Sequence, residues 1–188
     1  MRVIAGKHKG RGINIPKDRS ARPTRPMIRE AIFSILNSGE FLNEDGTNAI
    51  EGSTILDLFC GSGSFAIEAL SRGAKKAILV DNDKDNINLA RGNLESIREL
   101  ENAHLIGCDI EKLSTAKVQV DLVFIDPPYH NNLVQAAVKK LVENHWLKTG
   151  SIIIVETDIR EQYELPLDFD NILKKEYGST KIRFFKFK

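Results

Sequence analysis

The chain has 188 residues and a formal net charge of +1, with 41% hydrophobic and 28% charged residues, which fits one globular domain with a sizeable core. No apolar run approaches the roughly 20 residues of a membrane span, and the N-terminus lacks the apolar stretch of a secretory signal. Two cysteines, Cys60 and Cys108, are too few for a disulfide framework and lack zinc-site spacing. We therefore expect a soluble cytoplasmic protein without a metal and with no membrane partner.

The small net charge hides two basic ends and an acidic centre. Residues 1–30 carry nine basic and two acidic side chains, and residues 174–188 carry six and one, so the segment between them has a net charge of −11. This asymmetry suggests that both ends contact a polyanion, although basic tails can also serve solubility alone. The candidate contact residues in the N-terminal part are Arg2, Lys7, Lys9, Arg11, Arg22 and Arg25.

The N-terminal part precedes the main alternation of strands and helices. Residues 2–15 mix short apolar stretches with glycines and predict a β-hairpin that turns at residues 7–11. A proline-bearing loop follows at residues 22–26, and the apolar residues between positions 28 and 36 share one helical face. We expect residues 1–26 to form a basic extension that contacts nucleic acid and residues 27–188 to form the main domain.

From residue 53 the pattern alternates between buried strands and helices. Short strands separated by helices of this length predict an α/β fold with a doubly wound, mostly parallel, Rossmann-like sheet. Two last strands, joined around Gly178, should add an antiparallel hairpin at a sheet edge. The expected strands are Thr54–Leu58, 76–80, Ala103–Gly107, Val120–Ile125, 151–155, Phe169–Tyr177 and 181–187, and the expected helices are 64–71, 84–100 and about 133–141.

A glycine-rich turn follows the first of these strands. Gly61 permits a tight turn, Gly63 lets a ligand approach the backbone, and Ala66 is the third small position of a G-x-G-x-x-G/A pattern. Asp81 ends the next strand, 20 residues after Gly61, where a carboxylate can accept hydrogen bonds from ribose hydroxyls. A purely structural turn is the alternative, but the spacing predicts an adenosine-containing cofactor.

Two cofactors share this pattern. A nicotinamide dinucleotide brings a pyrophosphate, which favours backbone N–H groups without a nearby anion. Asp57 would repel a pyrophosphate but pair with the ammonium of a methionine moiety. Asp109 is placed to accept from an adenine amine, unless it caps a helix, so S-adenosyl-L-methionine fits better. The candidate cofactor-binding residues here are Asp57, Phe59, Gly61, Gly63, Asp81, Asn82, Asp109 and Ile110.

A second motif, Asp126-Pro127-Pro128-Tyr129, ends the fourth strand. The prolines donate no backbone N–H and fix their own φ, so the strand should stop in a stiff loop. A carboxylate beside a flat ring suits a planar group with an exocyclic amine, such as a nucleobase; the structural alternative is a plain proline turn. Asp126 and the Pro127 carbonyl would accept from the amine and position it for methyl transfer, and Tyr129 would stack on the flipped base. The candidate catalytic residues are therefore Asp126, Pro127, Pro128 and Tyr129.

The tetrad resembles the (D/N)-P-P-(Y/F) signature of S-adenosylmethionine-dependent amino methyltransferases, which alone does not separate adenine-N6, cytosine-N4 and guanine-N2. Residues 1–11, Arg22-Pro23-Thr24 and Arg29-Glu30-Ala31-Ile32-Phe33 resemble the bacterial RsmD family of 16S ribosomal RNA guanine-N2 methyltransferases. The resemblance continues through residues 57–63, 126–129 and 177–180, and so covers nearly the whole chain.

This resemblance implies a class I methyltransferase that modifies guanine 966 of 16S rRNA, within the small ribosomal subunit or its assembly intermediate. It also implies that the N-terminal extension contacts RNA and that Thr24 and Arg29 approach the methionine end of the cofactor. Asp81 stands where the family often has Glu, a mild departure. One compact domain acting on a large particle suggests a monomer. The rival classes are a nicotinamide-dependent reductase, which leaves Asp57 and the tetrad without roles, and a non-enzymatic RNA-binding adaptor.

Overall fold

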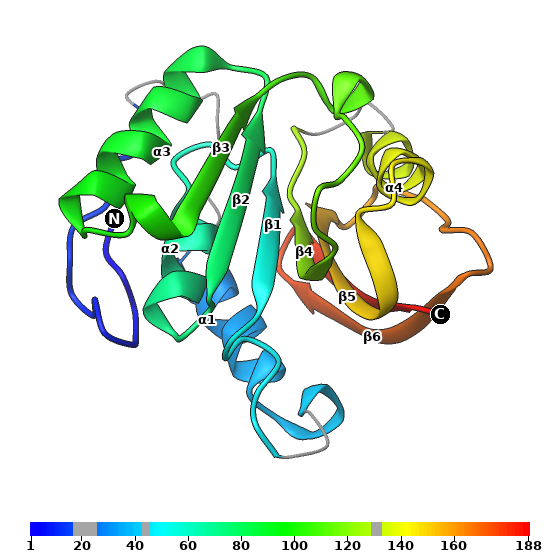
Figure 1. The fold of residues 1–188 in the computed structure, drawn as a ribbon. Helices are drawn as coiled ribbons and strands as arrows, with labels where there is room; N and C mark the ends of the chain where they lie inside the picture. Colours follow the sequence, from blue (N-terminus) through cyan, green and yellow to red (C-terminus); the bar gives the residue numbers. More distant parts are fainter. Residues whose placement is uncertain (17–25, 43–45, 129–132) are drawn as a thin grey trace.

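The structure, a computed structural model, describes residues 1–16, 26–42, 46–128 and 133–188, with only the backbone described at residue 40 (Figure 1). Seven strands form one sheet in the order β3-β2-β1-β4-β5-β7-β6. The first five pair in parallel, and β7 pairs antiparallel with both β5 and β6. The predicted doubly wound, mostly parallel sheet with a closing hairpin is therefore confirmed. The strands are β1 Thr54–Leu58, β2 Lys76–Asp81, β3 Ala103–Gly107, β4 Val120–Ile125, β5 Leu147–Asp158, β6 Phe169–Tyr177 and β7 Thr180–Phe187.

Helices cover both faces of this sheet. Apolar side chains of α1, α2 and α3 pack with Ile55, Leu79 and Phe124 on one face. On the other face, α4 packs with Leu56 and Val123. Within the described ranges, no helix has the length and apolar character needed to cross a bilayer. The helices are α1 Pro26–Leu36, α2 Ser64–Ser71, α3 Lys84–Ser96 and α4 Leu133–Glu143, with short 3-10 turns η1 Gly39–Phe41, η2 Leu100–Asn102 and η3 Ile110–Lys112.

The third helix ends earlier than the expected residue 100. Arg98 adopts a left-handed conformation with φ of 61°, and the Glu99 N–H donates to the Leu94 carbonyl at 2.9 Å. This closing turn is typical of helix C-termini. It turns the chain so that Glu99 lies buried against the N-terminal segment, where it accepts from Lys7 and His8.

The predicted N-terminal hairpin is present in an irregular form, with antiparallel backbone pairing but without two regular strands. One isolated bridge joins Arg2 and Gly12, and the described residues 1–16 contain no regular strand. The Val3 N–H donates to the Arg11 carbonyl, the Gly10 N–H donates to the Val3 carbonyl, and Met1 and Ile13 exchange two backbone bonds. Between these paired ends the segment also bonds to α2, since the N–H groups of Ile4 and Ala5 donate to Glu68 and that of Lys7 donates to the Ser71 carbonyl. We call residues 1–16 the N-terminal arm, which lies against α2 and α3 (Figure 1).

The fifth strand is longer than predicted at both ends. Its start tolerates a register shift against β4, where Val120 pairs with Leu147 and Leu122 with Ile152, around Gly150 with φ of 91°. Its other end continues past the apolar run to Asp158 because β7 pairs with it along that stretch. Glu156 is thereby carried to the carboxyl edge of the sheet.

Candidate functional site

A cleft of about 340 Å³ opens at the carboxyl ends of the parallel strands. Ligands of open α/β sheets bind at this edge, close to the point where strand order reverses. Here the reversal lies between β1 and β4. Most of the site residues predicted from the sequence line the cleft: Asp57, Phe59, Gly61, Asp81, Asn82, Asp109, Ile110, Asp126, Pro127 and Pro128.

The loop between β1 and α2 forms the floor of the cleft. Phe59, directly after β1, has φ of 60°, a conformation uncommon outside glycine and a form of strain that gathers at functional sites. Gly61 has φ of 52°, and a Cβ added there would meet no atom within 4 Å. Gly63 does not line the cleft, and a Cβ there would lie 2.9 Å from Leu79 and 3.2 Å from Ala90. Gly61 therefore faces the cleft, whereas Gly63 is required by the packing of α2 on β2 and α3.

Asp81 organises two neighbouring segments at the end of β2. One carboxylate oxygen accepts from the Gly61 N–H at 2.9 Å, and the other accepts from the Asp83 N–H at 2.9 Å and from the Asn86 amide at 3.3 Å. Asp83 in turn caps α3 by accepting from the Asp85 N–H. Asp81 thus holds the glycine turn and the start of α3 in place. Because Asp81 also lines the cleft, the predicted contact with a ribose is compatible with this structural role.

Asp57 is buried at the inner wall of the cleft, with 2% of its surface exposed. Burial holds the pKa of its carboxyl well above the usual value; the hydrogen bond from the Ala66 N–H opposes this shift, and the nearby charges of Asp126 and Asp81 add to it. A cationic group entering the cleft would lower this pKa because it favours the charged carboxylate.

For Asp109, the sequence allowed two roles, a contact with the ligand or a helix cap. Its side chain accepts from the Glu111 N–H at 2.9 Å and caps η3. The side chain is also exposed at the cleft, next to the buried Ile110. The capping bond uses one of its oxygens, so an adenine contact through the remaining acceptor capacity is compatible with the cap.

The second motif follows β4 on the same edge. Phe124, two residues before Asp126, stacks on Phe65 of α2 with ring centroids 4.0 Å apart and an interplanar angle of 7°. This packing fixes the end of β4 against the helix of the glycine turn. Asp126 is half-buried and Pro127 is buried, and both line the cleft. Tyr129, the predicted stacking residue, lies outside the described residues.

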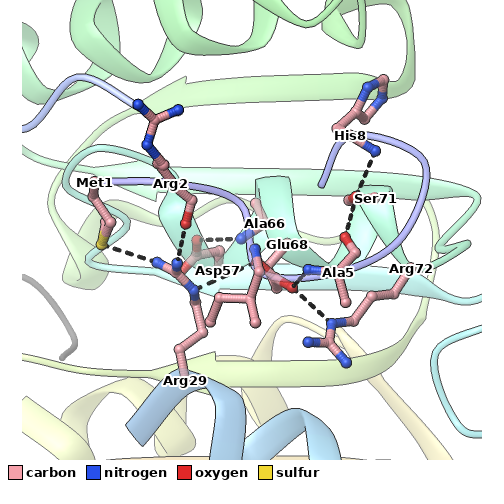
Figure 2. A network of polar contacts seen from close by, with 11 residues as sticks. Met1, Arg2, Ala5, His8, Arg29, Asp57, Ala66, Glu68, Ser71 and Arg72 are labelled. Atoms are coloured by element: carbon pink, nitrogen blue, oxygen red, sulfur yellow. Dashed lines mark hydrogen bonds and ion pairs between the residues drawn. The ribbon is translucent and has the colours of Figure 1, made fainter. Parts of the chain in front are cut away.

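Arg29 does not line the cleft, which differs from the contact that the family resemblance implied. Its fully buried guanidinium lies 3.7 Å from Glu68 and donates to the Arg2 carbonyl and the Met1 sulfur (Figure 2). The buried Glu68 carboxylate attracts it toward the N-terminal arm. Thr24, the other residue implied at the methionine end, lies outside the described residues.

The arm presents basic side chains and leads to the mouth of the cleft. Arg2, Lys7, Lys9 and Arg11 are exposed, and Lys7 also pairs with Glu99 at 2.7 Å. Near its end, the buried Asn93 of α3 exchanges two hydrogen bonds with the Asn14 backbone and donates a third to the Ser62 carbonyl of the glycine turn. Pro16 then lines the cleft. Two further predicted contact residues, Arg22 and Arg25, lie outside the described residues.

Several residues that line the cleft were not predicted from the sequence, and among them Glu156 and Thr180 bring polar side chains from β5 and β7. Glu156 lies near the end of β5 and Thr180 begins β7, and both are buried. The signal for Glu156 was a carboxylate that follows the apolar run of residues 152–155, as Asp126 follows the run before it. Thr180 carried no such signal because the place of β7 beside β5 depends on tertiary pairing.

The side chains that line the cleft suit a cationic adenosine cofactor. They include six carboxylates and, within the described part of the chain, no Lys, Arg or His. A pyrophosphate would meet this negative charge without a compensating cation, whereas an ammonium and a sulfonium would be attracted to it. This set of carboxylates therefore fits S-adenosylmethionine better than a nicotinamide dinucleotide.

Comparison with known proteins agrees with this geometry. Residues 1–186 match the family described as Conserved hypothetical protein 95. The chain is 33% identical to Ribosomal RNA small subunit methyltransferase D of Haemophilus influenzae, covering 99% of this chain and 93% of that protein. The structure of a putative methyltransferase yhhF from Escherichia coli superposes with a TM-score of 0.84 at 27% identity, covering 100% and 97% of the two chains. An RNA methyltransferase from Salinibacter ruber, solved with S-adenosyl-L-homocysteine, shares the fold at 12% identity with a TM-score of 0.65, covering 88% and 93%.

Proposed function

The chain belongs to the family described as Conserved hypothetical protein 95, the RsmD family, and from this premise we propose that it methylates ribosomal RNA of the small subunit. More finely, it transfers a methyl group from S-adenosyl-L-methionine to the exocyclic N2 amine of a guanine in 16S rRNA, guanine 966 by family resemblance. The observation that carries the proposal is one continuous cleft, which joins the glycine turn to Asp126 and Pro127.

The cofactor half of the cleft lies over β1, β2 and β3. S-adenosylmethionine, when bound, supplies an electrophilic methyl group on a sulfonium. Asp57 would face its ammonium group, Asp81 the ribose hydroxyls and Asp109 the adenine amine, since these three acids lie at the carboxyl ends of adjacent strands along the cleft. Asn82 and Ile110 would line the adenosine, and the buried walls around Asp57 would limit the entry of water.

The acceptor half begins at Asp126. An aromatic amine is a weak nucleophile because its lone pair is delocalised into the ring. Acceptance of its protons by the Asp126 carboxylate and the Pro127 carbonyl would localise that lone pair and aim it along the line of transfer. Tyr129 would stack on the base, which must leave its own stack to reach the cleft. Catalysis would thus consist mainly of positioning.

The arm supplies the RNA contact in this proposal. Its exposed basic side chains, Arg2, Lys7, Lys9 and Arg11, would neutralise phosphates next to the cleft, together with Arg22 and Arg25. The bonds of the arm to Glu68 and Ser71 hold it against α2, so that it reaches RNA as a preformed surface. We expect a monomer acting in the cytoplasm on the small subunit or its assembly intermediate.

Mass spectrometry of nucleosides tests the proposed reaction. Small subunits that lack the modification would be incubated with the protein and methyl-labelled S-adenosylmethionine, and their 16S rRNA would then be digested. We expect labelled N2-methylguanosine; labelled N6-methyladenosine or N4-methylcytidine would contradict the base assignment. Calorimetric binding of S-adenosylhomocysteine, with none of NADH, separates this function from that of a reductase.

A further inference from the structure

The sheet order divides the cleft into two halves. The strand ends of β1, β2 and β3 carry the acids assigned to the cofactor, whereas β4, β5 and β7 continue the cleft on the other side of β1. Glu156 belongs to this second half, beside the motif proposed to hold the target amine. The proposed positioning of the amine by Asp126 and Pro127 does not involve Glu156.

Register places Glu156 next to Asp126. β4 and β5 pair in parallel, with Phe124 opposite Ile154 and Ile125 opposite Val155, so the next pair in register is Asp126 and Glu156. Alternation puts Glu156 on the sheet face of Ile154, which packs in the same core cluster as Phe124. Neighbouring strands lie about 4.8 Å apart. Two carboxylates therefore stand side by side at the acceptor end of the cleft, with 4% of Glu156 exposed.

Two adjacent acceptors match only one of the bases that carry an exocyclic amine. The edge of guanine presents the N2 amine and the N1–H next to each other, both as donors. In adenine and cytosine, the ring nitrogen beside the amine is an acceptor. A carboxylate facing that nitrogen would meet a lone pair rather than a hydrogen, which leaves a buried polar group unsatisfied.

We propose that Glu156 accepts a hydrogen bond from N1–H of the target guanine, while Asp126 holds the N2 amine, and that Glu156 thereby selects guanine over adenine and cytosine. This inference rests on the proposed function and assigns the choice of base, which the Asp-Pro-Pro-Tyr tetrad alone does not make. Glu156 contacts the substrate but transfers no proton, so it is a specificity-determining residue. Asp126 can accept from the amine of guanine, adenine or cytosine, whereas Glu156 distinguishes guanine from the other two bases.

A base analogue tests this contact directly. 2-Aminopurine keeps the amine at C2 but has a bare N1, which accepts and does not donate. Small subunits reconstituted with guanine or 2-aminopurine at the target position would compete for the enzyme, and the ratio of kcat/KM would be measured. The parental protein should prefer guanine by roughly 10- to 100-fold, the range expected when a buried acceptor faces another acceptor.

Replacement of the carboxylate isolates the N1 contact from the loss of O6 in 2-aminopurine. Glu156→Gln places an amide there that can donate to a bare N1, so the preference for guanine should fall by about tenfold, the scale of one hydrogen-bond mismatch. Glu164→Gln, the same change at an exposed position of the following loop, should keep the parental ratio. Affinity for S-adenosylhomocysteine should be unchanged in both variants because β1 to β3 form that half of the cleft.

The outcomes separate this inference from the proposed function. An unaltered ratio in Glu156→Gln, with guanine still methylated by the parental protein, overturns the role of Glu156 and leaves the function standing. If Glu156→Gln does not fold, the parental protein still decides, since equal use of guanine and 2-aminopurine contradicts the contact. Failure of the parental protein to methylate any guanine of the subunit overturns the function and the inference together.

Discussion

Asp57 couples the protonation of the protein to the stability of the fold and, in the proposed function, to cofactor binding. Its carboxyl has a raised pKa in the unliganded fold because it is buried, and the nearby acids strengthen the shift. The folded state therefore binds this proton at pH values where the unfolded chain has released it. The free energy of unfolding must then fall as pH rises from the ordinary aspartate pKa, about 4, toward the folded-state pKa, by up to roughly 1.4 kcal/mol per pH unit.

An Asp57→Asn variant tests separately how the Asp57 carboxyl affects the free energy of unfolding and how it affects cofactor binding. The amide oxygen can still accept from the Ala66 N–H, but the charge is absent. We expect the free energy of unfolding at neutral pH to rise and its decline above about pH 4 to flatten, while cofactor affinity falls because no carboxylate faces the ammonium. Urea denaturation at several pH values and calorimetry would measure both. Unchanged cofactor binding would remove Asp57 from the site.

Asp81 is predicted to bind the ribose and is shown to hold the glycine turn. Asp81→Ala should therefore weaken binding of S-adenosylhomocysteine by about 2–3 kcal/mol, the range for hydrogen bonds to a charged group. Calorimetry at constant pH measures this directly. Asp168→Ala, an exposed aspartate outside the cleft, is the matched control. Parental affinity in Asp81→Ala would rule out the ribose contact.

At the scale of elements, α2 connects the two proposed binding regions. Its first turn follows the glycine loop, and its Ala66 N–H donates to Asp57. Two residues on, Glu68 accepts from the arm and from Arg72 at 2.8 Å, and Ser71 donates to the Ala5 carbonyl (Figure 2). One short helix thus fixes the position of the basic arm relative to the cofactor loop.

Charge reversal in the arm tests its proposed interaction with RNA. Changing Lys7, Lys9 and Arg11 to Glu should spare binding of S-adenosylhomocysteine, weaken RNA binding and flatten its salt dependence. The logarithmic slope should decrease by roughly 0.7–0.9 for each phosphate that the arm no longer neutralises. Filter binding at a series of salt concentrations would measure this. If the RNA affinity and the salt slope both stay at the parental values, the arm is a solvated surface only.

Elements with local signals were predicted well, and those that depend on distant partners were not. β1, β3 and β4 have the expected bounds because each is an apolar run between turn residues. The end of α3 differed because a left-handed Arg98 is invisible to helical periodicity. The arm pairs as the predicted hairpin at residues 1–3 and 10–13, but it forms no regular strands, since other backbone groups of the arm bond to Glu68 and Ser71, more than 60 residues away in sequence.

At the scale of the whole molecule, the doubly wound topology brings separate chain segments to one edge. The acids at the carboxyl ends of β1 to β4 could be predicted because such ends of parallel strands meet at the same edge of a sheet. Glu156 and Thr180 could not, since their positions follow from the extension of β5 and the antiparallel insertion of β7. Arg29 was assigned by resemblance, but the buried charge of Glu68 holds it on the arm side of α2.

The resulting charge distribution explains how an almost neutral chain can bind both proposed ligands. The acidic cleft favours a cationic cofactor, while the basic arm, which reaches the cleft at Pro16, favours phosphates. Separation of the two signs keeps the carboxylates away from the RNA backbone. Of the RNA, only the target base, which is a neutral group, would have to enter the acidic cleft.

The central claim is that Asp126 holds the target amine for transfer, and single-turnover methylation of small subunits tests it most directly. Asp126→Ala should lower the transfer rate by about 10²-fold or more, a loss of roughly 3 kcal/mol of transition-state stabilisation. Affinity for S-adenosylhomocysteine should change little because its predicted contacts lie on other strands, and Asp168→Ala should keep the parental rate. An Asp126→Ala protein that methylates guanine at the parental rate would contradict the mechanism.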